Sequence, residues 1–270
     1  MADRMSVLFD ASKCTACQAC SIACKQWNSL PAEKTTLTSS YQTHQTFTPQ
    51  TWTFITFKEV WANNKMEWLF FKKQCMHCAE AACLKACNHD AISHTDKGFV
   101  VIDHEKCIGC GYCVTNCTFN VPRIHPKTNK AYKCTGCPER VSNGLKPACV
   151  QTCQPEALVY GTRDEIMAMA KNRLEKIKPL HPQAVLYDAP KLEGVNFTYI
   201  LLREPEFYQL PNDPAVPVSV DIWKDFIRPF GGLAIAGAVL ATTVGFIKTR
   251  GQTTEHDYAS PKGKEVGKDE

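Results

Sequence analysis

Two neighbouring segments of the chain alternate apolar and polar residues with a period of two. TWTFITFKEVW (51–61) and KMEWLFFKK (65–73) are rich in aromatic and β-branched residues, and the pair NN (63–64) separates them. Alternation of this kind, interrupted by a turn signal, is typical of two paired strands. The pattern therefore predicts a β-hairpin over these residues.

Other apolar patterns predict two further strands and one surface helix. GFVVID (98–103) and VNFTYILL (195–202) are short β-rich runs. Thr162 and Glu165 have the spacing of a capping box, and the segment that follows, IMAMAKNRLEKIK, spaces its apolar residues as a helix does. We expect an amphipathic helix there.

The longest apolar run lies near the end of the chain. FGGLAIAGAVLATTVGFI, from Phe230 to Ile247, contains no charge and would span about 27 Å as a helix, close to the thickness of a bilayer core. A buried helix of a soluble domain could show the same run, but its small residues suit packing against membrane helices. We expect a transmembrane helix over 229–248, after a proline-rich extended linker over 203–228 and before a polar, disordered tail over 249–270.

Basic residues are more numerous after this run than before it. Two precede it and five follow it: Lys224 and Arg228, then Lys248, Arg250, Lys262, Lys264 and Lys268. The positive-inside rule then predicts a cytoplasmic C-terminus and a periplasmic or otherwise extracytoplasmic main domain. The N-terminus has neither an apolar stretch nor a twin arginine, so export would depend on the signal of a partner.

The amino-acid composition is ordinary except for the number of cysteines. The chain is 44% hydrophobic and 21% charged with a net charge of +4, which is ordinary for a globular protein and gives no sign of nucleic-acid binding. Its sixteen cysteines among 270 residues are anomalous. They form four groups of four, each ending in C-x3-C, with none left over: Cys14, Cys17, Cys20 and Cys24; Cys75, Cys78, Cys83 and Cys87; Cys107, Cys110, Cys113 and Cys117; Cys134, Cys137, Cys149 and Cys153.

The spacing within the groups indicates iron–sulfur chemistry. Groups one and three read C-x2-C-x2-C-x3-C, the ligand run of bacterial ferredoxins, in which the fourth cysteine binds the other of two clusters. Groups two and four lengthen only the third interval. Zinc ribbons use separated C-x2-C pairs, and disulfide scaffolds are typical of short secreted chains, so both fit less well. Four cubane clusters would use every thiol.

Four other residues lie beside the cysteines. His77 lies within CMHC and His89 just after Cys87, but every group already has four thiols, so packing or surface roles fit these histidines better than ligation. Tyr112 and Phe119, near group three, are expected to shield a cluster from water.

The motifs resemble a known family. EWL before CMHC, then CLKAC, CIGCGYC, YKCTGC, RVSNGLKPACVQTC and a terminal span after IWKDFIRPF resemble the iron–sulfur (beta) subunit of membrane-bound formate dehydrogenase over about residues 8 to 248. The similar nitrate reductase subunit has a tryptophan at the place of Cys110, so the resemblance implies four [4Fe–4S] clusters and no three-iron centre. The proline that usually follows the last ferredoxin cysteine is missing in all four groups, which bears on cluster potentials and not on ligation.

The resemblance also implies a fold and a set of ligands. The fold would be α+β, with two tandem double-cluster ferredoxin-like units in residues 1–202, a β-hairpin insertion and one C-terminal transmembrane helix. Groups one and four would form one unit, and groups two and three the other. By crossover, the implied ligands are Cys14, Cys17, Cys20 and Cys153 for cluster 1; Cys75, Cys78, Cys83 and Cys117 for cluster 2; Cys107, Cys110, Cys113 and Cys87 for cluster 3; Cys134, Cys137, Cys149 and Cys24 for cluster 4.

The implied function is that of an electron wire without a catalytic site. Electrons from formate would come from a catalytic alpha subunit with a molybdenum or tungsten pterin cofactor and a twin-arginine signal. They would leave to a membrane cytochrome b gamma subunit and quinone. Two alternatives stay open: the same role in another molybdopterin oxidoreductase, for polysulfide, thiosulfate or a similar substrate, or a zinc-stabilised, membrane-tethered interaction protein.

Overall fold

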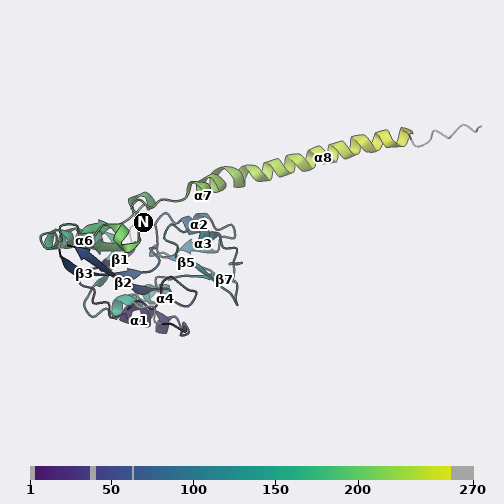
Figure 1. Cartoon of the computed structure of the whole chain (residues 1–270). Coiled ribbons are helices and arrows are strands. Elements are labelled where there is room, and N and C mark those ends of the chain that lie inside the picture. The colour runs from purple at the N-terminus through teal and green to yellow at the C-terminus, as the bar shows by residue number, and fades with distance from the viewer. Residues whose placement is uncertain (1–3, 37–40, 63, 257–270) are drawn as a thin grey trace, which may run out of the picture. The chain divides into compact units, whose positions relative to one another are not determined.

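The structure is a computed structural model that describes residues 4–36, 41–62 and 64–256. The chain forms two compact units, Met1–Val220 and Asp221–Glu270. Figure 1 labels many of the elements. The strands are β1 (Met5–Asp10), β2 (Phe54–Ala62), β3 (Lys65–Lys73), β4 (Ile92–His94), β5 (Val100–Ile102), β6 (Arg123–His125), β7 (Lys130–Tyr132), β8 (Leu158–Thr162), β9 (Val185–Tyr187) and β10 (Phe197–Leu201).

The helices are mostly short. They are α1 (Ala19–Trp27), α2 (Ala82–Lys85), α3 (Tyr112–Thr115), α4 (Pro138–Ser142), α5 (Ala148–Gln151), α6 (Arg163–Ile177), α7 (Val218–Ile222) and α8 (Arg228–His256), with 3-10 turns η1 (Pro190–Leu192) and η2 (Pro205–Tyr208) and a π-helical segment η3 (Trp223–Ile227).

A four-stranded mixed sheet organises the first unit. Its strand order is β8-β1-β10-β9, and β1 pairs in parallel with β10 and antiparallel with β8. Successive side chains of a strand point to opposite faces, and β1 is apolar on both. Val7 and Phe9 therefore belong to the core on one face, while Leu8 belongs to the core on the other.

Helix α6 covers the face of the sheet that carries Leu8. Its Ile166 and Ala170 are buried with Leu8 and Ile200. The helix begins with the predicted capping box: Thr162 Oγ1 accepts a hydrogen bond from the Glu165 amide, and the Glu165 carboxylate accepts one from the Thr162 amide at 3.0 Å. The prediction of an amphipathic helix after this box is confirmed.

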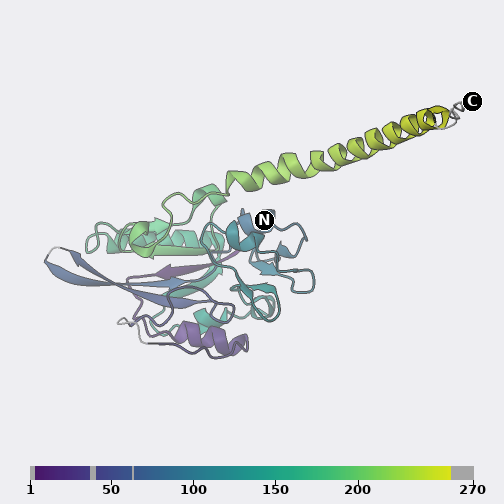
Figure 2. The same cartoon turned by 45° about the vertical axis from the view of Figure 1, so that its right-hand side comes forward.

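The β2–β3 hairpin packs on the opposite face, and its prediction is also confirmed. Phe71 lies with its ring centre 6.1 Å from that of Phe9 and 4.8 Å from that of Tyr199. Figure 2 shows α6 on one side of β1 and the long hairpin on the other. Of the predicted turn, Asn63 lies outside the described residues.

Short helices and small hairpins make up the rest of the first unit. Helix α1 contacts α5, and α2 contacts α3. The hairpins β4–β5 and β6–β7 lie between the cysteine-rich loops along the chain. Each of these four helices includes cysteines of a different group, so the helix contacts bring group one to group four, and group two to group three.

Two expectations for the last third of the chain need correction. The segment after 202 is not extended throughout, because Pro205 begins the η2 turn and the apolar side chains of Tyr208 and Leu210 are buried in the core of the first unit. The tail expected from 249 is helical as far as His256, since α8 continues without a break. Residues 257–270 lie outside the described part.

The second unit is dominated by α8. Within it, Phe230–Arg250 contains an 18-residue window with a mean hydropathy of 1.9, and its 21 residues span about 32 Å at 1.5 Å per residue. This is the thickness of a bilayer hydrocarbon core. Large apolar side chains such as Leu233, Leu240 and Ile247 are exposed on it. Length and composition therefore agree with the predicted transmembrane helix.

Candidate functional site

Three cavities in the first unit are each lined by four cysteines that come from two groups. We call these groups of four the first, second and third sets. Each set combines three thiols of one loop with the last thiol of a distant loop. The first set is Cys14, Cys17, Cys20 and Cys153; the second is Cys75, Cys78, Cys83 and Cys117; the third is Cys87, Cys107, Cys110 and Cys113.

The remaining four cysteines, the fourth set, are Cys24, Cys134, Cys137 and Cys149. All four are buried, and the contact of α1 with α5 brings Cys24 toward Cys149. Burial and then the charge of Cys149 raise the pKa of Cys24 to about 12, with Cys137 acting in the same direction. Burial and the charge of Cys24 also raise the pKa of Cys134. The fourth set is thus close enough for its thiols to interact.

The other sets have the same electrostatic character. Burial raises the pKa of Cys20 to about 11, and burial together with the charges of Cys107 and Cys110 raises the pKa of Cys113 to about 12. Several thiolates in one buried place repel one another unless a cation lies among them. Iron bound by four thiolates supplies such a cation, so the donor sets fit iron–sulfur clusters.

Hydrogen bonds to sulfur occur in all four sets. The amides of Ala16, Val121 and Ala131 donate to the Sγ atoms of Cys14, Cys117 and Cys107 at 3.4 to 3.5 Å. Asn28 Nδ2 lies 3.7 Å from the Sγ of Cys24. Such bonds stabilise negative charge on sulfur and tune cluster potentials.

The loop of group three depends on glycine at two positions. Gly109 and Gly111 have φ of +73° and +83°, in the left-handed region that favours glycine. A Cβ at Gly109 would collide with the backbone oxygen of Asn129, whereas a Cβ at Gly111 would meet nothing within 4 Å. The two positions thus share a backbone conformation and differ in free space.

We expect Gly109→Ala to lose the cluster of the third set, because the collision with Asn129 moves the loop that carries Cys107 and Cys110. Gly111→Ala is the matched control, since it adds the same side chain at a cost of only about 1–2 kcal/mol of backbone strain. Iron and sulfide per chain, measured after anaerobic purification, should fall in the first variant alone. Equal iron in both would contradict this role of the loop.

The four cysteine sets differ in the solvent exposure of their thiols. Cys17 of the first set and Cys110 of the third set are exposed, whereas no cysteine of the second or fourth set is. Exposed apolar side chains occur in the same segments: Ile22, five residues after Cys17, is 64% exposed, and Ile108, which lines the third cavity with Cys110, is 51% exposed. The first and third cavities therefore lie nearest the surface.

The two histidines and two aromatic residues that lie near the cysteines in sequence are packed inside the protein or line the cavities. His77 is fully buried against Phe99, and its Nδ1 accepts a hydrogen bond from the Val100 amide at 2.9 Å, which agrees with a packing role. His89 and Tyr112 line the third cavity, and Phe119 lines the second.

Two buried lysines line the cavities and were not predicted from the sequence. Lys72 lies in the wall of the first cavity and Lys133 in the wall of the second, with 0% and 4% of their surfaces exposed. Burial lowers the pKa of Lys72, but the charges of Cys149 and Cys20 outweigh it, and the pKa lies above its ordinary value. The pair KK at the end of β3 could have revealed one of them, because adjacent strand residues face opposite sides.

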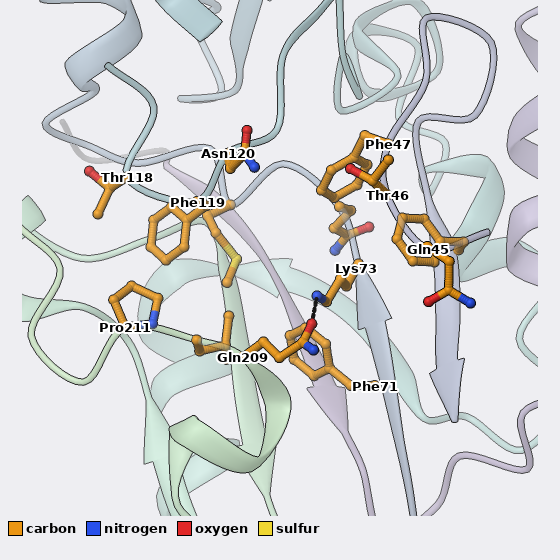
Figure 3. Close-up of a pocket in the computed structure, with 14 residues that line it drawn as sticks. Gln45, Thr46, Phe47, Phe71, Lys73, Thr118, Phe119, Asn120, Gln209 and Pro211 are labelled. Carbon is orange, nitrogen blue, oxygen red and sulfur yellow. Dashed lines mark hydrogen bonds between the residues drawn. The ribbon is translucent and has the colours of Figure 1, made fainter. Parts of the chain in front are cut away.

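A wider pocket of about 310 Å³ lies beside the second cavity (Figure 3). Gln74, Met76 and Thr118, neighbours of Cys75 and Cys117 in sequence, line it, but no cysteine does. Lys73 points across it to Gln209, whose side-chain oxygen accepts a hydrogen bond at 2.6 Å.

Comparisons with known proteins agree with this chemistry. The 4Fe–4S dicluster domain family matches residues 66–163, and the family described as formate dehydrogenase N, transmembrane, matches residues 216–257. The second match, together with the apolar helix α8, identifies a membrane-anchored protein.

Curated relatives cover most of the chain. A formate dehydrogenase iron–sulfur subunit of Haemophilus influenzae is 39% identical over 93% of this chain and 82% of its own length. The nitrate-inducible formate dehydrogenase iron–sulfur subunit of Escherichia coli is 40% identical over 89% and 82%. The formate dehydrogenase-O iron–sulfur subunit of the same organism is 34% identical over 97% and 90%. The chain therefore belongs to the family of formate dehydrogenase iron–sulfur subunits, which transfer electrons as non-catalytic parts of an oxidoreductase.

Proposed function

We propose that the four cysteine sets hold four [4Fe–4S] clusters and that these conduct electrons from formate oxidation toward the membrane. The observation that carries the proposal is that three separate cavities each collect three thiols from one group and one from another. This is the crossover that joins paired clusters in ferredoxins. Two double-cluster units follow, one from groups one and four and one from groups two and three, within residues 1–202.

Packing between the sets supports an order. Cys20 of the first set and Cys149 of the fourth share one apolar core. Cys134 of the fourth set shares a second core with Cys75 of the second set. Cys83 of the second set shares a third core with the third set. Cys78 of the second set also packs against the first core, but the buried cysteines connect the sets in the order first, fourth, second, third, and we propose this order for the path. Its two ends are the sets with an exposed cysteine.

The residues of the chain give this path its properties. A [4Fe–4S] cluster, when bound, accepts or gives up one electron. The thiolates hold each cluster, and the amides of Ala16, Val121 and Ala131 donate hydrogen bonds to ligand sulfur. Apolar side chains such as Val100 and Phe119 line the second cavity and keep water away from it. Exposed Cys17 and Cys110 mark where electrons enter and leave.

We propose two partners. A catalytic subunit with a molybdenum or tungsten pterin cofactor supplies the electrons, and a membrane cytochrome b subunit that reduces quinone accepts them beside α8. The basic residues after the span favour a cytoplasmic C-terminus and a periplasmic cluster domain, exported with the twin-arginine signal of the catalytic subunit.

The proposal is tested on the complex purified anaerobically with this chain in it. We expect four irons and four sulfides for each of the four cysteine sets, a broad visible absorbance, and bleaching of that absorbance when formate is added. Formate should also reduce a quinone analogue in membranes. A colourless chain with zinc in place of iron would overturn the proposal, and clusters that formate does not reduce would remove formate as the electron source.

A further inference from the structure

We propose that the buried ammonium groups of Lys72 and Lys133 raise the reduction potentials of the clusters whose cavity walls these lysines form. This inference rests on the proposed function, because it requires clusters in the first, second and fourth cysteine sets. It assigns a role to the chain itself: to set the driving force along the electron path.

Lys72 is held inside the protein. It projects from β3, is fully buried, and donates hydrogen bonds through Nζ to Thr53 Oγ1 at 2.7 Å and to the side chain of Gln74. Its Nζ also lies 6.0 Å from the ring centre of Phe197. Its hydrogen-bond partners are neutral, so they orient the ammonium group without neutralising it.

Lys133 repeats this arrangement in the second cavity. Its Nζ donates to the carbonyl oxygens of Val100 and, at 3.0 Å, of Cys134. Within the described residues, neither Lys133 nor Lys72 lies within ion-pair distance of a carboxylate. Buried charges in proteins are paired or lie beside metal sites, which leaves the contents of the cavities as the partners of both lysines.

The cysteine sets supply the opposite charge. Lys72 lines the first cavity, and it interacts electrostatically with Cys149, Cys134 and Cys24 of the fourth set as well. Lys133 lines the second cavity and interacts with Cys83 and Cys117. The residues that line the third cavity include no lysine or arginine.

The direction of the effect follows from charge. Reduction adds one electron to a thiolate-bound cluster and makes it more negative by one charge, while no proton is transferred and no bond breaks. A fixed cation in a low-dielectric site stabilises the more negative form, and net charge around a cluster is one of the determinants of its potential. The clusters beside Lys72 and Lys133 should therefore be easier to reduce than without these lysines.

The test compares variants of the intact complex, loaded with iron and titrated with dithionite and mediator dyes while EPR spectra are recorded. Lys72→Gln removes the charge and keeps a donor for Thr53. We expect its first- or fourth-set cluster to show at least a tenfold lower ratio of reduced to oxidised form at a fixed potential, which is about 59 mV for one electron. Lys133→Gln should shift a different cluster.

Matched controls separate charge from structure. Lys73→Gln removes the same charge from the adjacent residue of β3, whose side chain points away to Gln209, and should leave all potentials unchanged (Figure 3). Lys72→Arg keeps the charge and should restore the potential. The third-set cluster should not respond to any of these changes.

Each outcome decides between the two proposals. Iron below four per cysteine set in the unaltered chain would overturn the clusters themselves. Full iron with unmoved potentials in both glutamine variants would overturn only the lysine inference. Loss of iron in both glutamine variants, with iron retained in Lys72→Arg, would assign the lysines to cluster assembly and would likewise overturn a role in setting potentials.

Discussion

Replacing Cys110 with alanine should stop electron transfer to the membrane acceptor while the catalytic subunit goes on oxidising formate with an artificial dye. Cys110 is exposed, so its loss costs little packing, and a loss of iron in this variant would identify Cys110 as a ligand. Changes in residues that merely orient metal ligands cost about 10–100-fold, so removal of the proposed ligand itself should lower formate-dependent quinone reduction by more than about 100-fold. Quinone reduction by membranes and dye reduction by the purified complex are the two measurements.

Thr115→Ala is the matched control for this prediction. Thr115 is also exposed and lies in α3, the helix that follows the same loop, but it carries no thiol. We expect full iron and full quinone reduction in this variant. Normal quinone reduction in Cys110→Ala, with an unchanged cluster spectrum, would show that Cys110 is not a ligand.

Replacing Leu240 with arginine should prevent the insertion of α8 and release this chain from the membrane. Leu240 lies at the centre of Phe230–Arg250 and is exposed on the helix. An arginine at the centre of a membrane helix costs about 3 kcal/mol on insertion scales, which corresponds to about a hundredfold in partitioning. The measurement is the distribution of the chain between the membrane and soluble fractions after alkaline extraction.

Thr249→Arg provides the comparison, because it adds the same side chain near the end of the span, between Lys248 and Arg250. A charge at this position can reach the lipid headgroups, so the chain should stay in the membrane fraction. If Leu240→Arg also stays there, α8 is not the anchor and another subunit holds the chain at the membrane.

Features with a local cause could be predicted from the sequence. The hairpin over Phe54–Lys73 follows from alternation around a turn, and the start of α6 follows from the side-chain hydrogen bonds of Thr162 and Glu165. The apolar length of α8 is likewise a property of one segment. Cysteine spacing is likewise local: it predicts that the first three cysteines of a group lie together, and three cavities are each lined by three such cysteines.

Features that depend on distant contacts could not be predicted. Strand β1 is apolar on both faces and shows no alternation, because it lies between β8 and β10 with α6 on one side and the hairpin on the other. The prolines after residue 202 indicated an extended linker, but the burial of Tyr208 and Leu210 overrides that local preference.

The lysines show the same limit of sequence reasoning. Lys72 carries the residue type of a solvated surface, yet the strand direction turns it into the first cavity while Lys73 faces Gln209. The burial of Lys72 beside the thiols could not be predicted, because it depends on cysteines that come from two distant loops.

The place of β1 in the sheet has a consequence for biosynthesis. This strand is made first, yet both of its neighbours, β8 and β10, lie more than 145 positions further along the chain, and Cys14 shares its cavity with Cys153. At 5–20 residues per second, a ribosome needs roughly ten to forty seconds to reach Leu201. The first cysteine set is complete only once Cys153 has been made, and β1 gains its parallel neighbour only once β10 follows. We therefore expect the proposed first cluster to form late in synthesis, and a nascent chain that stops before Cys153 should not acquire it.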